Sequence, residues 1–318
     1  MFTMKYMTNA ERLAPTLQRI LLATCVLCCS LASYASAQVA TRKARWYFNF
    51  GDAVEIEFYG NESPLHVANF FDYANDDDYN SSYIHRSVSG SSRFFQGGSY
   101  YIPPSPTLDN LSSLPITAGS QIPNEFNAAN GLSNTPGTLA AARTAHPDSA
   151  TSGWFINITN NASGFDPGPY TVFGQVTKGL DFLNLVAQQP LFENIFPGYS
   201  SAPYGTAPLI NGESLFVIQE VLEVSVLDGD YDDNGMVNAG DLAEWNQDYG
   251  TAGFLQADGD GNRNVGGGDF LLWQSNFGAT SATPAIGVVP EPTSLALAAC
   301  GLAALGFARR RKIQLAGR

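Results

Sequence analysis

The sequence predicts a mainly β fold, a closed antiparallel barrel capped at its ends by two helices. Short apolar segments typical of strands recur between residues 54 and 226, whereas only two segments there have helical spacing. In residues 54–59 (Val-Glu-Ile-Glu-Phe-Tyr) apolar and charged side chains alternate, as in a strand with one buried face. Many short strands with few helices favour a barrel, because closure of the sheet removes its exposed edges.

The other elements follow in order along the chain. Ser63 and Pro64 are typical of a helix start, so a helix is expected over residues 65–74 with Ser63 as its N-cap. Residues 99–122 and 189–209 are rich in Pro, Ser and Gly and are expected to be long surface loops. Further elements are expected as strands at residues 83–86, 93–97, 138–142, 154–158, 170–176 and 215–226, and as a helix at residues 179–187.

Composition and charge limit the classes of function. The chain has 318 residues, of which 44% are apolar and 12% aromatic, enough for one large domain with additional segments. Residues 38–289 contain eight basic and 27 acidic residues, a net charge of −19, which disfavours nucleic acid and anionic lipid as partners. This body contains no cysteine, which excludes disulfides, thiolate metal sites and a cysteine nucleophile there.

The N-terminal residues 1–37 have the pattern of a signal peptide. Arg19 precedes a short apolar run, and Ala35-Ser36-Ala37 supplies small residues before a cleavage site. Cleavage after Ala37 would leave Gln38 as the mature N-terminus. The alternative is an uncleaved anchor helix, although the apolar run is short for a membrane span.

The C-terminal residues 289–318 resemble a PEP-CTERM sorting signal. Pro290-Glu291-Pro292 is followed by an apolar segment, residues 295–307, and by the basic residues 309–312. The resemblance implies a membrane helix held by its cytoplasmic positive charges and an exosortase-type enzyme that cuts near the motif. A permanent C-terminal anchor is the alternative. Whether the C-terminal segment is cleaved or remains as an anchor, residues 38–289 are expected outside the cytoplasmic membrane, at the cell surface, the outer envelope or the extracellular matrix.

An acidic segment is duplicated before the sorting signal. Residues 230–241 and 258–269 repeat with an offset of 28 residues, and each copy precedes an apolar helix signal that contains a tryptophan, Trp245 or Trp273. Oxygen ligands at loop positions 1, 3, 5, 7 and 12 suit Ca²⁺, which takes six to eight oxygens. The predicted ligands, with the backbone carbonyl at position 7, are Asp230, Asp232, Asn234, Met236 and Asp241 in the first loop and Asp258, Asp260, Asn262, Asn264 and Asp269 in the second.

With Asp at position 12 and each loop followed by a helix, residues 227–280 resemble a dockerin type I module. This implies structural Ca²⁺ and a cohesin-like or other surface partner; a calcium-stabilised spacer is an equal alternative. Arg263 departs from the small turn residue expected at position 6, so weaker calcium binding is expected in the second loop. Chelation is expected to unfold only residues 230–277. Residues 281–288 form a linker.

The body, residues 38–226, resembles the cyclophilin-type peptidyl-prolyl isomerases. The resemblance is carried by three blocks, residues 83–98 (with His-Arg and Gln-Gly-Gly), 149–157 and 170–174. It implies a cyclophilin-like barrel that isomerises X-Pro bonds of polypeptides without a cofactor. The implied catalytic residues are Arg86, Gln96 and Phe155, and the implied substrate-binding residues are Phe94, Ala142, Trp154, Phe165 and Tyr170.

Several residues depart from the family pattern. Gly153 stands where the family usually has Gln, and Trp154 where it usually has Phe. Ala141 stands where a Met usually lines the proline slot, so a wider slot is expected. The usual slot Phe corresponds to either Phe94 or Arg93. These departures leave two hypotheses open, an active exported isomerase and a binding module for proline peptides with little turnover. His85 is expected to be structural, because the reaction needs no proton transfer.

Overall fold

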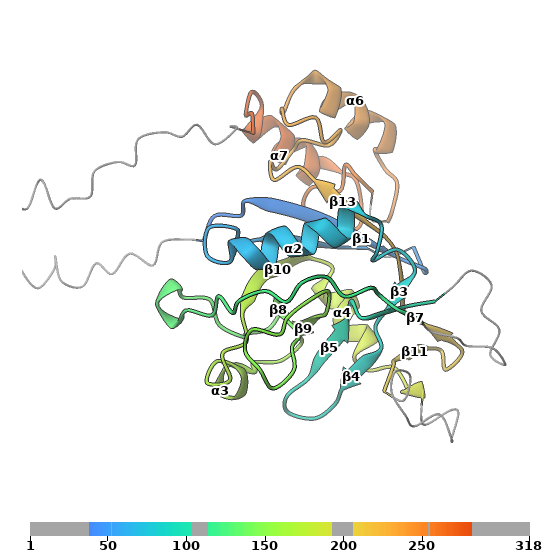
Figure 1. Cartoon of the computed structure of the whole chain (residues 1–318). Helices are drawn as coiled ribbons and strands as arrows, with labels where there is room; N and C mark the ends of the chain where they lie inside the picture. Colours follow the sequence, from blue (N-terminus) through green and yellow to red (C-terminus); the bar gives the residue numbers. More distant parts are fainter. Residues whose placement is uncertain (1–37, 52, 103–113, 193–205, 254, 282–318) are drawn as a thin grey trace, which may run out of the picture.

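The computed structural model describes residues 38–51, 53–102, 114–192, 206–253 and 255–281, and its main body is one curled antiparallel sheet (Figure 1). The order of the strands is β4-β5-β9-β8-β10-β2-β1-β13-β3-β6-β7. Their bounds are β1 Arg42–Phe48, β2 Ala53–Phe58, β3 Ser82–Tyr83, β4 Arg86–Val88, β5 Phe94–Gly97, β6 Tyr100–Tyr101, β7 Leu114–Pro115, β8 Thr138–Ala141, β9 Trp154–Asn157, β10 Val172–Lys178 and β13 Val217–Val224. A separate pair is formed by β11 Leu209–Ile210 and β12 Ser214–Leu215.

The sheet is curled because the short segment that contains β3 and β4 pairs with strands from both halves of the sheet. β3 pairs with β13, whereas β4, which starts three residues after β3 ends, pairs with β5. Between them, Ile84 N–H donates to the Phe216 carbonyl and His85 N–H to the Gln96 carbonyl, both at 3.1 Å. The pairing order of the described strands nevertheless ends at β4 and β7. The structure therefore shows a curled sheet where the sequence predicted a closed barrel. The sequence analysis also missed β1, the strand between β2 and β13.

Aromatic side chains fill the core inside the curl. Trp46 of β1 lies 4.7 Å from Trp154 of β9 and 5.6 Å from Phe70 of the helix α2 (Pro64–Asn75), measured between ring centroids. The helix α4 (Leu180–Val186) adds Phe182, which packs on Phe48 at 5.4 Å. Both predicted helices are thus present, each with its apolar face buried against the sheet. Two short helices, η2 (Ala128–Asn130) and α3 (Ala162–Phe165), lie in the connections.

The start of α2 is capped by a distant residue. Ser63 occupies the predicted N-cap position, but its hydroxyl donates to the carbonyl of Val172 at 3.0 Å and makes no cap bond. Instead, the carboxylate of Glu125 accepts the backbone N–H groups of Leu65 at 3.0 Å and His66 at 2.9 Å. The helix start was therefore predicted correctly, but the residue that satisfies its free N–H groups was not.

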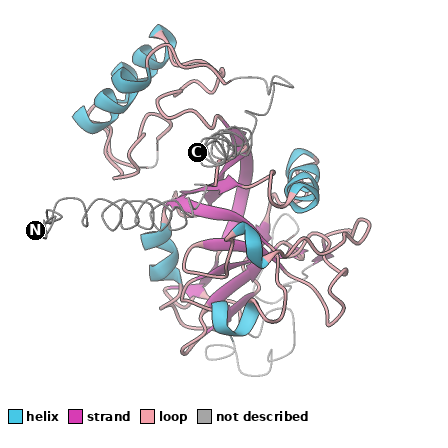
Figure 2. Ribbon diagram, turned by 90° about the vertical axis from the view of Figure 1, so that its left-hand side faces the viewer, coloured by secondary structure: helices cyan, strands magenta, loops and turns pink. Residues whose placement is uncertain are grey.

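The C-terminal helices α6 (Ala239–Asp248) and α7 (Gly267–Asn276) form a small layer beside the sheet, and each follows an acidic loop (Figure 2). The Trp245 indole N–H donates to the Gly266 carbonyl at the start of α7. In return, Trp273 donates to the Asn238 carbonyl at the start of α6. The two repeats thus hold each other's helix starts. No helix in the described ranges is long and apolar enough to cross a membrane, and the predicted terminal helices lie outside those ranges.

Candidate functional site

The hairpin of β4 and β5 brings Arg86 and Gln96 together. The two residues are direct cross-strand partners, and the Arg86 guanidinium donates to Gln96 Oε1 at 3.2 Å. Phe94 lies on the same face of β5, two residues before Gln96, and the Arg86 guanidinium carbon is 5.1 Å from its ring centroid. Arg86 is exposed to solvent beside this ring.

A cluster of four aromatic rings lies next to this pair. Phe155 of β9 is the direct partner of Gln96, and its ring is 5.6 Å from Phe94 and 5.2 Å from Phe165. Tyr170 completes the cluster at 5.7 Å from Phe155 and 5.2 Å from Phe165. The part-buried Ala142 packs against the same cluster. Of the predicted catalytic and substrate-binding residues, Gln96 and Phe94 thus contact the Arg86 guanidinium. Four others, Phe155, Phe165, Tyr170 and Ala142, belong to the same cluster as Phe94, whereas Arg93 does not.

Trp154 corrects the sequence-based assignment. It is only 1% exposed, and its ring lies in the main core against Trp46, so it is not a substrate-binding residue. The cause is strand alternation, because Phe155 faces the aromatic cluster and its neighbour must face the opposite side. The indole also explains the Gly-Gly pair. A Cβ atom at Gly97 or Gly98 would lie 2.4 to 2.5 Å from Trp154 ring atoms.

The two other departures from the family pattern have structural consequences of their own. Ala141 packs into the main core, opposite Trp154 in the β8–β9 ladder, so it does not widen the proline slot as predicted. At Gly153, a Cβ atom would meet Ser99 Oγ at 3.1 Å and Ala142 Cβ at 3.3 Å. Ser99 and Ala142 therefore leave little space for a side chain at position 153.

Arg143 is a residue of this region that the sequence analysis missed. Its guanidinium carbon lies 4.1 Å from the Tyr170 ring centroid, and its N–H groups donate to the carbonyls of Thr144, at 2.9 Å, and Gly168. These contacts tie the end of β8 to the loop that carries Tyr170. In the sequence, its place next to the predicted substrate-binding residue Ala142 could have suggested that Arg143 belongs to the site. Its contact with Tyr170 could not be predicted, because the two residues are 27 positions apart.

His85, next to Arg86, is buried at 8% exposure and packs edge-on against Tyr100 at 5.1 Å. Burial, with a smaller contribution from the Arg86 charge, lowers the pKa of His85 to about 4. The imidazole is therefore neutral at neutral pH, which agrees with a structural role and leaves Arg86 as the cation of the pair.

This pKa predicts acid destabilisation. Between pH 6.5 and 4 the unfolded chain protonates His85 but the folded chain does not, so the free energy of unfolding should fall as the pH falls. The expected loss is on the order of 3 kcal/mol across this window. Urea unfolding at a series of pH values measures it, and His85→Phe should remove most of the slope. An equal slope in both proteins would contradict the assignment.

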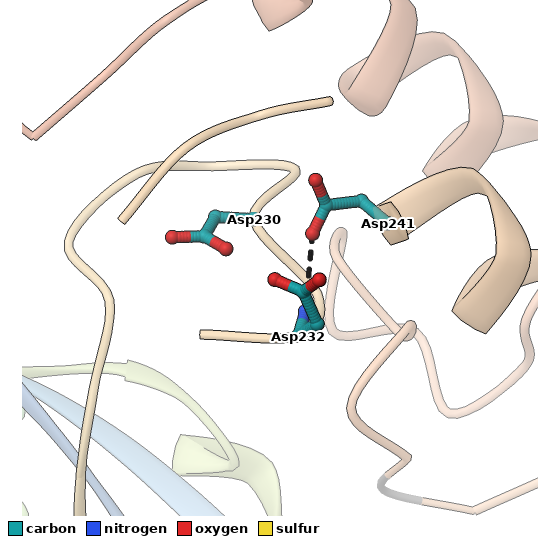
Figure 3. Close-up of side chains that lie close together, drawn as sticks. All are labelled: Asp230, Asp232 and Asp241. Atoms are coloured by element: carbon teal, nitrogen blue, oxygen red, sulfur yellow. Dashed lines mark hydrogen bonds between the residues drawn. The ribbon is translucent and has the colours of Figure 1, made fainter. Parts of the chain in front are cut away.

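The two acidic loops each bring three carboxylates together. Figure 3 shows Asp230, Asp232 and Asp241 close to one another, and one carboxylate oxygen of each lies within 4.8 Å of the others. In the second loop, one oxygen from each of Asp258, Asp260 and Asp269 also lies within 4.8 Å of the others. The C-terminal Asp of each triad is fully buried at the start of its helix. The six carboxylates predicted from loop positions 1, 3 and 12 are therefore gathered as expected.

The remaining predicted ligands lie on the same loops. The amide groups of Asn234 and Asn262 donate to Asp232 at 2.8 Å and to Asp260 at 2.9 Å. Their side-chain oxygens accept the N–H groups of the position 7 residues, Met236 and Asn264, both at 2.9 Å. The Met236 carbonyl accepts the Asn238 amide at 3.1 Å. These oxygens are thus partly engaged in bonds within the loops.

Asp258 shows that the second loop suits a cation. The residue is 2% exposed, and among the described residues its Oδ1 atom has no hydrogen-bond partner. Burial raises the pKa of Asp258 despite the opposing hydrogen bond from the Arg263 N–H and the charge of Lys178, and the carboxylates Asp269 and Asp260 add a smaller increase. A buried carboxylate oxygen without a donor is unfavourable unless a cation or proton reaches it. The residues present therefore fit an oxygen-liganded cation.

The curled sheet thus carries an exposed guanidinium beside a cluster of aromatic rings. Comparisons identify the class. A family model for cyclophilin type peptidyl-prolyl cis-trans isomerase/CLD matches residues 46–198, and one for the PEP-CTERM protein-sorting motif matches residues 288–312.

Curated relatives agree. A peptidyl-prolyl cis-trans isomerase of Acinetobacter baylyi is 41% identical over 146 residues, which cover 45% of this chain and 70% of the relative. Peptidyl-prolyl cis-trans isomerase A of Dickeya dadantii is 33% identical over 188 residues, 58% of this chain and 90% of the relative. Isomerase B of Escherichia coli is 34% identical over 147 residues, 44% of this chain and 81% of the relative. The chain therefore belongs to the cyclophilin-type peptidyl-prolyl cis-trans isomerases, and it is an enzyme of that class.

Proposed function

We propose that this isomerase is exported and acts on X-Pro bonds of extracytoplasmic proteins, and that an exosortase-type enzyme sorts it to the cell surface. The match to the PEP-CTERM motif at residues 288–312 carries this proposal. The signal-peptide pattern in residues 1–37 and the acidic body support it. Both the signal peptide and the sorting segment lie outside the described residues, so surface tethering rests on sequence alone.

Residues of the aromatic cluster and the hairpin supply the proposed mechanism. Rotation about an X-Pro bond breaks amide resonance, so the twisted peptide nitrogen regains a lone pair that can accept a hydrogen bond. Arg86 would donate to this nitrogen. Its bond to Gln96 uses one N–H group, and its exposure leaves the guanidinium accessible to a peptide, which supports this role. Gln96 is proposed to bind the substrate carbonyl through its amide N–H. Phe94, Phe155 and Phe165 would hold the proline ring.

The sorting proposal predicts a processing defect. Changing Pro290, Glu291 and Pro292 to alanine should leave the sorting segment attached, because the transpeptidase would no longer find its site. The mature protein should then be retained in the membrane fraction at a higher mass. Fractionation and mass spectrometry of the C-terminus in the native host measure this. Identical processing of the variant and the unaltered protein would rule out cleavage at this motif.

We further propose that each acidic loop binds one structural Ca²⁺ through the triads Asp230, Asp232, Asp241 and Asp258, Asp260, Asp269. The paired, partly buried carboxylates and the partnerless Asp258 oxygen support this. Ca²⁺ would neutralise the clustered charge and stabilise the loops, with no part in the isomerase reaction. The likeness to a dockerin, and a cohesin-like or other surface partner, are part of the same proposal.

Arg263 should limit the affinity of the second loop. Its backbone φ is 67°, a region that costs a non-glycine residue about 1 to 2 kcal/mol, and it adds positive charge next to the triad. Gly235, at the same position in the first loop, has φ 82° without that cost. Arg263→Gly should therefore tighten Ca²⁺ binding in the second loop about fivefold or more, as measured by calorimetric titration. Gly235→Arg is the matched variant and should weaken the first loop. Unchanged or weaker binding by Arg263→Gly would contradict this prediction.

A further inference from the structure

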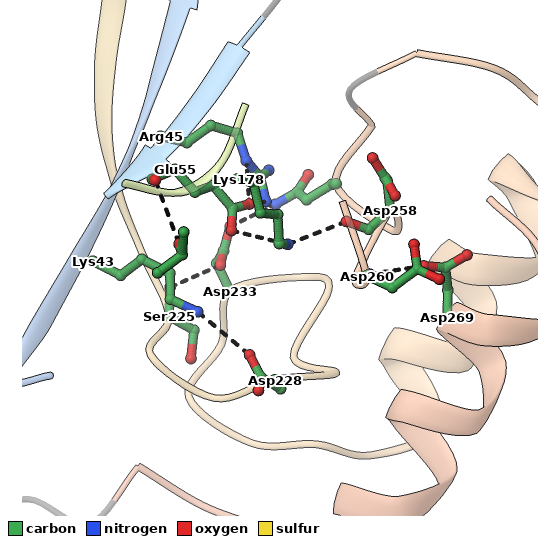
Figure 4. A network of polar contacts seen from close by, with 12 residues as sticks. Lys43, Arg45, Glu55, Lys178, Ser225, Asp228, Asp233, Asp258, Asp260 and Asp269 are labelled. Carbon is green, nitrogen blue, oxygen red and sulfur yellow. Dashed lines mark hydrogen bonds and ion pairs between the residues drawn. The ribbon is translucent and has the colours of Figure 1, made fainter. Parts of the chain in front are cut away.

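The second acidic loop lies directly against the isomerase domain. Figure 4 shows Lys178, at the end of β10, between Glu55 of β2 and the loop residue Asp258. The Lys178 ammonium is 2.9 Å from Glu55 Oε2 and donates to the Asp258 carbonyl at 3.1 Å. Its methylenes lie over Gly261, where a Cβ atom would meet Lys178 Cγ at 2.9 Å. One lysine thus contacts both the sheet and the loop.

This contact completes a buried network of charges. Glu55 is 3% exposed and Arg45 is 6% exposed, and Arg45 Nε donates to Glu55 Oε1 at 2.9 Å. Lys178 occupies the other oxygen of Glu55, so two cations share one buried carboxylate. The Lys178 ammonium, whose side chain is 16% exposed, has N–H groups left that need a hydrogen-bond acceptor. The Asp258 carbonyl supplies it.

Both loops take part in the contact. Asp233 of the first loop accepts the backbone N–H of Ser225, which follows β13, at 2.9 Å and the amide of Gln256 at 2.7 Å. Arg263 lies 3.5 Å from Asp181 of α4. Arg263, the residue at position 6 of the second loop, therefore contacts the isomerase domain through its side chain. Gly235, at position 6 of the first loop, has no side chain that could make such a contact.

We infer that the second acidic loop is an internal docking surface whose partner is the isomerase domain of the same chain. Because the loop contacts β2 and β10 through Lys178, the stability of the loop and the stability of these two strands are then coupled. A cation bound by the loop therefore also stabilises the sheet. The cation part rests on the calcium sites proposed above. This differs from the sequence-based expectation that chelation unfolds residues 230–277 alone.

Hydrogen exchange of the full chain, followed by mass spectrometry with and without Ca²⁺, tests the inference. Without Ca²⁺, Lys178→Met should speed amide exchange in residues 255–265 at least about tenfold, because the loop loses its charged anchor. Arg42→Met is the matched control. It also removes a cation from the sheet, but Arg42 pairs with Glu223 of β13 rather than with a loop. Unchanged loop exchange in Lys178→Met would overturn the docking.

The coupling is tested in the same experiment. Ca²⁺ should slow exchange in β2 and β10 of the unaltered chain and do so much less in Lys178→Met. At a Ca²⁺ concentration that saturates the loops of both proteins, Arg263→Gly should reduce this slowing by a smaller amount, because its ion pair is exposed. This variant replaces Lys178→Met if Lys178→Met does not fold. Slowing confined to residues 227–281 would overturn the coupling. If Ca²⁺ changes exchange nowhere, the calcium proposal and the coupling both fail, while the docking still depends on the Ca²⁺-free comparison.

Discussion

Replacing Arg86 by alanine is expected to lower kcat/KM for an Ala-Pro peptide about 10²–10³-fold, the range seen when one preorganised donor to a transition state is lost. The melting temperature should change little, because Arg86 is exposed and its described contacts are Gln96 and the face of Phe94. A protease-coupled assay measures the rate. Arg86→Lys should remain strongly impaired, because an ammonium lacks the fork that reaches Gln96 and the substrate together.

Arg93→Ala is the control for this variant. Arg93 lies on the same hairpin, but Phe94 is the residue that joins the aromatic cluster, so the rate should stay close to that of the unaltered enzyme. An Arg86→Ala enzyme as fast as the unaltered one would remove Arg86 from the mechanism. A chain that binds the peptide but does not accelerate its isomerisation would favour the binding-module hypothesis.

Replacing Trp154 by alanine is expected to destabilise the isomerase domain by about 3 to 5 kcal/mol, the usual loss for a large buried aromatic side chain. The indole is 1% exposed and fills the space between Trp46 and the backbone of Gly97 and Gly98. Urea unfolding followed by circular dichroism measures the change. At temperatures where the variant stays folded, KM for the peptide should remain close to that of the unaltered enzyme.

Leu185→Ala on α4 is the surface control, since Leu185 is 57% exposed, and it should change stability by no more than about 0.5 kcal/mol. A stable Trp154→Ala enzyme with a raised KM would return Trp154 to the substrate site and refute its assignment to the core.

Local sequence patterns predicted the elements well. The strands at β5, β8 and β9 and the helices α2 and α4 lie within a few residues of their predicted ranges, because alternation and helical spacing are local properties of the chain. β1 was missed because its basic residues Arg42, Lys43 and Arg45 obscure the alternation of a strand. In the structure Arg45 and Lys43 are buried by carboxylates of β2 and of the segment after β13, partners that no local pattern contains.

The sequence alone determined the chemistry of this protein. The resemblance of three sequence blocks to a known family implied that Arg86, Gln96 and Phe155 share one site, and the spacing within the repeat predicted six carboxylates in two loops. Only the tertiary structure decided which side of β9 faces the site, which residue caps α2, and that Lys178 and Arg263 join the acidic loops to the isomerase domain. Those outcomes depend on contacts between residues far apart in the chain, where burial and charge pairing, rather than local preference, determine the arrangement.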